Sequence, residues 1–280
     1  MMPGARSPQS SPRPQGDGAR ASKSGEAHPK QQASRDHPAF SALRSLAFAL
    51  FQMLVTPPYA LVVLALWWLP PMPRFRFITY WCALNLWGAR VICGIRHRVI
   101  GLENIGDAPK IVACKHSSTW ETLFLSRLLP PLAFVAKKEL LSLPFFGWAF
   151  RLASPITIDR KAGQDAMSDI ARQGRERFAQ GFWIILFPEG TRIPVGNRVR
   201  YKTGTSRLAI AMQAPILPIA HNAGWLWPKG VMGKRPGTIT LSIGKPIAAD
   251  GRDPAQLMQA VETWIENEVA RLGKPVASSP

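Results

Sequence analysis

The stretch Cys114–Leu123, CKHSSTWETL, holds the residue types that general base catalysis requires. His116 is followed five positions later by Glu121. An imidazole takes up a proton near neutral pH, and a carboxylate on its other ring nitrogen fixes the tautomer and stabilises the imidazolium. The pair predicts a base that activates a hydroxyl group. The alternative is that Glu121 only caps the start of a helix.

Helix geometry limits where this pair can lie. Residues five apart on an α-helix point about 140° away from each other, so His116 and Glu121 cannot meet if both are helical. The run KIVAC, residues 110–114, is typical of a strand that ends just before His116. The run STWE, Ser118 to Glu121, matches a capping box. We expect His116 to precede the helix and Glu121 to lie in its first turn, where both roles are compatible.

A second stretch, FPEGTR from Phe187 to Arg192, follows the apolar run FWIIL and has the composition of a phosphate site. After a strand ending near Pro188, Gly190 and Thr191 would present backbone amides and Arg192 a planar guanidinium. The alternative is an ordinary turn with a solvated arginine.

Two further stretches supply cations that could lie near this site. Arg160 comes after the strand pattern PITI, and Lys202 lies in the segment YKTG. Both could reach the same side of a sheet as Arg192. A basic surface patch is the alternative for each of them.

The elements that must position these residues form an α/β pattern from residue 99 to 273. Short β-branched runs alternate there with helical patterns, which predicts a mixed sheet flanked by helices. Strands are expected at 110–114, 132–136, 155–158, 182–187, 215–220 and 238–243, and helices at 118–129, 164–180, 204–213 and 254–271.

Ahead of this domain, residues 41–98 are predicted to form a membrane-associated helical region. No charge occurs between Arg44 and Arg74, and the 24 residues 46–69 would extend about 36 Å as one helix. Pro57 and Pro58 interrupt this run, so either a kinked span or two half-length helices in a re-entrant hairpin is expected. The segment 77–95, rich in tryptophan and flanked by arginine, suits the membrane interface.

Composition adds further expectations about the tails, the partners and the compartment. Residues 1–40 and 274–280 have the composition of disordered tails, the first of them basic. Lys and Arg number 35 against 17 Asp and Glu, and of the resulting +18, residues 46–280 carry +14 (28 against 14). Such charge favours anionic partners. Cys82, Cys93 and Cys114 form no metal or disulfide pattern, which indicates a domain facing the cytoplasm.

Taken in order, these stretches resemble the glycerolipid acyltransferase family over roughly residues 75–250. The matching blocks are His116 with Glu121, ITIDR ending at Arg160, FPEGTR, and PILPIA from Pro215 to Ala220. The first block departs from the family, where the acid is more often Asp. In the second block, Gly163 stands where a further arginine is often found.

The resemblance implies transfer of a fatty acyl group from acyl-CoA or acyl carrier protein to the sn-2 hydroxyl of 1-acyl-glycerol-3-phosphate, giving phosphatidic acid without a metal or cofactor. It implies that His116 is the base, oriented by Glu121, at a membrane on its cytoplasmic face, the inner membrane if bacterial. The residues that would bind substrate are Arg160, Glu189, Gly190, Thr191 and Arg192, with Lys202 beside them, and Pro215–Ala220 would shape the pocket.

Three alternatives stay open. Cys114 lies two residues before His116 and could form an acyl-enzyme. Another lysolipid could be the acceptor. In a different class of function, the pI near 10.8 suits a non-catalytic protein that binds anionic membranes or nucleic acid, although no nucleic-acid motif occurs and nucleic acid is not expected as a partner.

Overall fold

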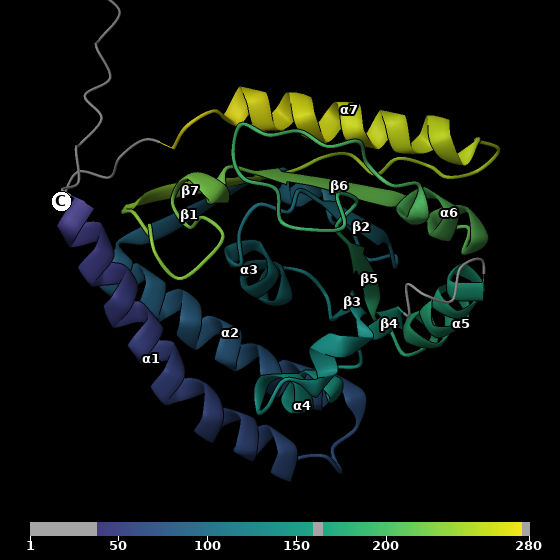
Figure 1. Ribbon diagram of the computed structural model, residues 1–280. Coiled ribbons are helices and arrows are strands. Elements are labelled where there is room, and N and C mark those ends of the chain that lie inside the picture. The colour runs from purple at the N-terminus through teal and green to yellow at the C-terminus, as the bar shows by residue number, and fades with distance from the viewer. Residues whose placement is uncertain (1–37, 159–164, 276–280) are drawn as a thin grey trace, which may run out of the picture. The chain divides into compact units, whose positions relative to one another are not determined.

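The computed structural model describes residues 38–158 and 165–275, and their centre is a seven-stranded sheet in the order β1-β7-β6-β2-β5-β3-β4 (Figure 1). The strands are β1 Ile95–Ile100, β2 Ile111–Cys114, β3 Leu132–Lys137, β4 Ile156–Ile158, β5 Trp183–Leu186, β6 Ile216–His221 and β7 Gly237–Ile243. Every neighbouring pair is parallel except β6 with β7. The predicted mixed sheet is confirmed.

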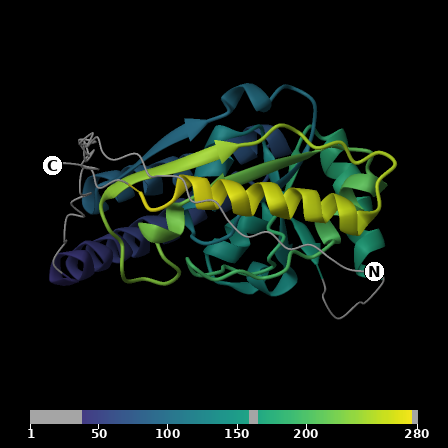
Figure 2. The same ribbon diagram turned by 90° about the horizontal axis from the view of Figure 1, so that it is seen from above.

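Helices cover both faces of the sheet, which buries the central strands. α7 (Pro254–Leu272) runs over β6 on one face, and α6 (Gly204–Ala211) lies beside it (Figures 1 and 2). α3 (Trp120–Leu128) lies on the other face, and α5 (Asp165–Ala179) packs against β4 and β5. All residues of β2 and β6 are buried, as expected of parallel strands covered on both faces.

Each strand and helix predicted for the α/β domain is present, but β1 and the short helix α4 (Phe146–Arg151) were not predicted. β1 reads IRHRVI and lies at the sheet edge, where only Ile95 is buried. The arginines of β1 interrupt the apolar pattern that would predict a strand. Pairing with β7 stabilises β1 in a way that its local sequence does not indicate. The sheet therefore begins at Ile95 rather than at residue 99.

The predicted membrane-associated region forms a helical hairpin. α1 (Pro38–Ala65) and α2 (Pro71–Cys93) run antiparallel, since Gln52 bonds to Asn85, Trp81 to Thr56, and Tyr59 to the carbonyl of Phe77. α2 buries Phe75, Thr79, Cys82, Asn85, Gly88, Ala89 and Cys93, a helical stripe that faces α1 and α3. The segment 77–95 is thus largely a packed helix that joins the hairpin to the domain.

α1 continues through Pro57 and Pro58, so of the two predicted alternatives the break into two half-length helices at these prolines is wrong. The chain instead reverses between Ala65 and Pro71. Packing outweighs the two lost backbone hydrogen bonds, because Ala60 and Val63 are buried beyond the prolines and Tyr59 bonds to α2. α1 is the helix in the described residues that is long and apolar enough to cross a membrane, with 17% of its most apolar window buried.

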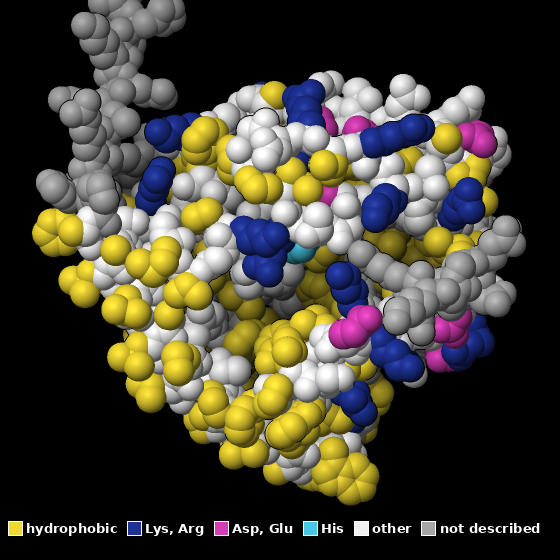
Figure 3. Space-filling model, viewed as in Figure 1, with side chains coloured by type: hydrophobic (Ala, Val, Ile, Leu, Met, Phe, Trp, Pro, Cys, Tyr) yellow, Lys and Arg dark blue, Asp and Glu magenta, His cyan; other side chains and the backbone are white. Residues whose placement is uncertain are grey.

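The hairpin leaves large apolar side chains in solvent, and we call them the apolar hairpin face (Figure 3). Its members on α1 and the following turn are Phe40, Leu43, Leu46, Leu50, Met53, Leu54, Leu61, Val62, Trp67 and Trp68, and on α2 Tyr80, Trp87 and Val91. Exposed apolar side chains gathered on one pair of helices mark a site of interaction with a membrane or a protein. The predicted tails lie mostly outside the described residues, which exclude 1–37 and 276–280.

Candidate active site

Two adjacent parallel strands bring the first and third motifs together. β2 and β5 pair with Ala113 opposite Leu186, so His116 and Phe187 both leave the sheet at the same edge. Their rings stack with centroids 3.9 Å apart. The carboxyl ends of parallel strands are the usual place for a site in an α/β sheet. The distance in sequence between the motifs is therefore no guide to their distance in the fold.

His116 and Glu121 meet as predicted. His116 Nδ1 lies 2.8 Å from Glu121 Oε1, and the same oxygen accepts the backbone N–H groups of Ser117 and Ser118. Ser118 Oγ in turn accepts the N–H of Trp120, which completes the start of α3. The predicted helix start and the predicted contact with the imidazole therefore occur together, and the catalytic role of Glu121 stays a prediction.

The burial of the two partners differs in a way that suits a base and its orienting group. The Glu121 side chain is fully buried, whereas the His116 side chain is 16% exposed and lines a cavity. Phe187 stacks on one face of the imidazole, which constrains the plane of the ring. With Nδ1 directed at Glu121, the second nitrogen, Nε2, is the one available to a substrate.

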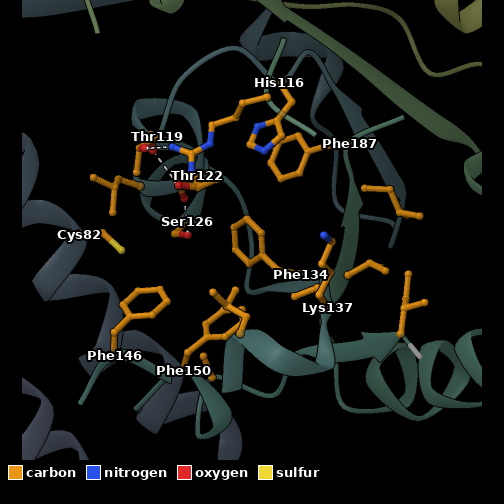
Figure 4. Close-up of a pocket in the computed structure, with 18 of the residues that line it drawn as sticks. Cys82, His116, Thr119, Thr122, Ser126, Phe134, Lys137, Phe146, Phe150 and Phe187 are labelled. Atoms are coloured by element: carbon orange, nitrogen blue, oxygen red, sulfur yellow. Dashed lines mark hydrogen bonds between the residues drawn. The ribbon is translucent and has the colours of Figure 1, made fainter. Parts of the chain in front are cut away.

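A cavity of about 1460 Å³ opens beside His116 and extends between the sheet and the hairpin (Figures 3 and 4). Its far wall is apolar, with Phe134 from β3 and Phe146 and Phe150 from α4. Thr119, Thr122 and Ser126 of the α3 segment line the opposite side with hydroxyl groups. α1 and α2 also contribute side chains to the cavity wall, so the hairpin that carries the apolar face encloses part of the cavity.

Arg192 and Lys202 line the cavity, together with Gly190 and Thr191. Arg192 Nη1 donates to Thr119 Oγ1 at 2.7 Å, which ties the FPEGTR loop to the start of α3. Gly190 has φ 72° and its Cα faces Lys202, where an added Cβ would lie 3.2 Å from Nζ. These groups form a basic rim close to His116. Arg160 lies outside the described residues, so its predicted role stays a prediction.

Glu189 does not take the place predicted for it. Its side chain is buried outside the cavity lining, and Oε1 accepts the backbone N–H of His116 and contacts Lys115 Nζ at 3.2 Å. This side chain does not face the cavity, so a part of Glu189 in holding the glycerol phosphate would be indirect and stays a prediction. Burial raises the pKa of Glu189, and Lys115 opposes this effect. The structure assigns Glu189 to the support of the His116 backbone.

Three buried groups behind the site were not predicted as functional. Lys115 pairs with Glu266 of α7, and the His221 Nε2–H donates to the Lys115 carbonyl at 2.8 Å while Nδ1 accepts the N–H of Ala223. For Lys115 the available sequence signal is its position next to His116, and for His221 it is the position directly after PILPIA. Glu266 lies 150 residues from His116, and no local pattern distinguishes it.

Cys114 is poorly placed for an acyl-enzyme. Its side chain is fully buried on β2 and is absent from the cavity lining. Burial raises the pKa of the Cys114 thiol well above its usual range, which disfavours the nucleophilic thiolate. The structure therefore gives no support to this alternative.

Comparisons with known proteins agree with the site. A family model described as Acyltransferase matches residues 96–222. The 1-acyl-sn-glycerol-3-phosphate acyltransferase of Pseudomonas aeruginosa is 47% identical over 208 residues, covering 73% of this chain and 81% of the relative. The enzyme of that name from Saccharomyces cerevisiae is 29% identical over 214 residues, covering 73% of this chain and 68% of the relative.

Among solved structures, the crystal structure of the 1-acyl-sn-glycerophosphate acyltransferase from Thermotoga maritima matches with a TM-score of 0.68 and 26% identity, covering 82% of this chain and 95% of that one. The resemblance inferred from four short motifs is thus confirmed over most of the chain. This chain is an acyltransferase and belongs to the 1-acyl-sn-glycerol-3-phosphate acyltransferase family.

Proposed function

We propose that this protein transfers a fatty acyl group from a thioester donor, acyl-CoA or acyl carrier protein, to the sn-2 hydroxyl of 1-acyl-glycerol-3-phosphate, giving phosphatidic acid. The observation that carries the proposal is the His116–Glu121 pair at the mouth of an apolar cavity with a basic rim. The relatives named above support this choice of acceptor. The reaction needs no metal or other cofactor.

In the proposed reaction His116 acts first as a base and then as an acid. Nε2 takes the proton of the acceptor hydroxyl as its oxygen attacks the thioester carbonyl, and Glu121 stabilises the imidazolium through Nδ1. The tetrahedral intermediate then collapses with cleavage of the C–S bond. The thiolate leaves as a thiol after receiving the proton from His116. No acyl-enzyme is formed.

The basic rim suits the phosphate of the acceptor. Arg192 is held in place by Thr119, which leaves its remaining N–H groups for phosphate oxygens, and Lys202 adds a second positive charge. We include Arg160 in this set by analogy with the family motif, together with the backbone of Gly190 and Thr191. The donor also carries phosphate groups, so the +14 of residues 46–280 favours both substrates.

We place the enzyme at the cytoplasmic surface of a membrane, the inner membrane if the cell is bacterial. The apolar hairpin face would enter the lipid, and the cavity beside it would receive the acyl chains. Contacts bind both halves of α1 to the rest of the chain, from Ser41 with Lys234 to Tyr59 with α2. Such contacts favour a hairpin seated in one leaflet over a helix that crosses both.

The proposal is tested with membranes that contain the wild-type protein or His116→Ala. Transfer of a labelled acyl group to lysophosphatidic acid is measured with acyl-CoA and, separately, with acyl carrier protein. We expect the substitution to lower kcat by about 10²- to 10⁴-fold, the usual contribution of a general base. Matched expression and apparent Tm serve as the control for folding.

Two results would contradict the proposal. Activity retained by His116→Ala would remove the base from the mechanism. Well-folded wild-type protein that is inactive with both donors would reject this acceptor, and other lysolipids would then be assayed. If every acceptor fails, salt-sensitive binding to anionic vesicles or duplex DNA would identify the non-catalytic alternative.

A further inference from the structure

A buried ionic cluster lies behind the active site, outside the large cavity. Lys115 Nζ contacts Glu266 Oε1 at 2.7 Å and Glu189 Oε1 at 3.2 Å. The Tyr201 hydroxyl donates to Glu266 Oε1 at 2.7 Å, and Arg198 approaches the other oxygen at 3.4 Å. Lys115, Glu189, Glu266 and Tyr201 are all buried, and none of them lines the large cavity. The substrates in the proposed reaction therefore do not contact this cluster.

The cluster nevertheless reaches the reacting residue through the backbone. Lys115 directly precedes His116, and Glu189 accepts the backbone N–H of His116 at 3.1 Å. The Lys115 N–H and carbonyl are also bound, by the carbonyl of Ile219 and by His221 respectively. One lysine thus connects α7 to both loops that form the site, the loop after β2 and the loop after β5.

The charges explain why each member depends on the others. A buried ammonium or carboxylate is costly unless it is paired, and Lys115 is the cation between two buried carboxylates. If Glu266 is lost, Lys115 keeps Glu189 as its buried partner and is free to shift toward it. That shift would move Glu189 Oε1, and with it the N–H of His116.

We propose that Glu266 is a positioning residue for the acyl transfer, acting through Lys115 and Glu189 to fix the backbone of His116 and the FPEGTR loop. This inference rests on the proposed function for its kinetic effect. It assigns a role in catalysis to the C-terminal helix α7, which contributes no side chain to the large cavity.

The kinetic test compares Glu266→Leu, Glu266→Gln and wild type with lysophosphatidic acid and acyl-CoA. For Glu266→Leu we expect kcat to fall about 10- to 100-fold, because small displacements of a base reduce rates by such factors. KM for both substrates should change less than about twofold, since the cavity is untouched. Glu266→Gln keeps an oxygen that accepts from Tyr201 and Lys115, and it should recover most of kcat.

Glu268→Gln is the matched control, because it removes a carboxylate on the same helix that lies outside the buried cluster and forms an ion pair with the surface residue Arg271. It should leave kcat and KM unchanged. If Glu266→Leu does not fold, Tyr201→Phe replaces it, since this change removes only the hydroxyl that holds Glu266. Wild-type kcat in folded Glu266→Leu or Tyr201→Phe, or a loss confined to KM, would overturn the proposal.

A second measurement does not depend on the acceptor. Hydrogen exchange followed by mass spectrometry should show faster exchange in Glu266→Leu for peptides covering residues 114–121 and 187–193. A role confined to the stability of α7 would accelerate exchange only in α7 and near Tyr201, and that result would refute the positioning role. Inactive wild-type protein with the expected exchange pattern would instead reject the proposed acceptor alone.

Discussion

At the scale of single residues, one carboxylate oxygen of the candidate active site accepts hydrogen bonds from several donors at once. Glu121 Oε1 accepts from the imidazole of His116 and from two backbone amides. These amides belong to the loop that carries His116, so the carboxylate holds the ring and its backbone together. This arrangement accounts for the fit of a glutamate where the family more often has aspartate, because the carboxylate still reaches both the imidazole and the helix start.

The burial of His221 predicts that the stability of the folded chain depends on pH. Burial lowers the pKa of His221, and the carboxylate of Glu121, 3.7 Å away, only partly opposes this effect. The unfolded chain takes up a proton below about pH 6.5, where the folded chain does not. The stabilising contribution of neutral His221 is therefore complete above that pH and is lost as the pH falls.

We expect the apparent Tm of the wild type to fall more steeply between about pH 7 and pH 5.5 than that of His221→Gln. Differential scanning fluorimetry in detergent measures both slopes. Burial also lowers the pKa of His97, which remains in both proteins, so some slope persists in the variant. Parallel curves for the two proteins would show that His221 does not titrate in this way.

At the scale of elements, the site is assembled where segments distant in sequence meet. The FPEGTR loop follows β5 and the loop that carries His116 follows β2, and the hydrogen bond from Arg192 to Thr119 joins the two. Thr119 immediately precedes α3, so a hydroxyl at a helix start sets the direction of the guanidinium on the neighbouring loop. The phosphate site that we propose is therefore formed by the contact between the FPEGTR loop and the start of α3, rather than by Arg192 alone.

Replacement of Thr119 by valine tests this contact. Thr119→Val keeps the shape of the side chain but removes the acceptor, and hydrogen bonds to charged groups contribute about 1.5 to 3 kcal/mol. We expect KM for lysophosphatidic acid to rise about tenfold or more, with kcat little changed. Thr119→Ser, which retains the hydroxyl, should behave like the wild type. Equal KM values for wild type and Thr119→Val would separate Thr119 from acceptor binding.

At the scale of the whole molecule, the same two helices carry the apolar hairpin face and line part of the cavity, which suits the lipid substrates that we propose. α1 and α2 present the exposed apolar side chains on one side and line the cavity on the other. In the proposed function the hairpin would therefore serve two purposes, association with lipid and enclosure of the acyl chains. The excess of positive charge adds attraction to anionic lipid.

The turn of the hairpin offers a test of this surface, since Trp67 and Trp68 are 69% and 65% exposed. Trp67→Ser/Trp68→Ser should lower the fraction of protein bound to phosphatidylglycerol-containing vesicles severalfold in a flotation assay, because indole rings favour the membrane interface. Leu102→Ser, which changes an exposed apolar residue on another part of the domain, is the control. Undiminished binding by the double variant would mean that the turn does not contact lipid.

The sequence by itself determined the fold class, the order of most elements and the motifs of the site. Short continuous hydrophobic runs in the sequence predict strands that are buried on both faces of a sheet. The capping box predicts that His116 lies just before its helix. The family could be inferred because its motifs are local and keep their order. Signals of this kind depend on neighbours in sequence, which is why they could be read without the fold.

Tertiary structure alone decided the edge strand β1, the continuity of α1 through its prolines and the placement of Glu189. Each of these depends on contacts between distant segments, such as β1 with β7 or Glu189 with Lys115. Glu266 shows the limit most clearly, because an ordinary glutamate in an amphipathic helix becomes a partner of the active-site loop only when α7 packs on β6. Tertiary packing decides which charged residues meet, and the local order of residues in the sequence does not determine that packing.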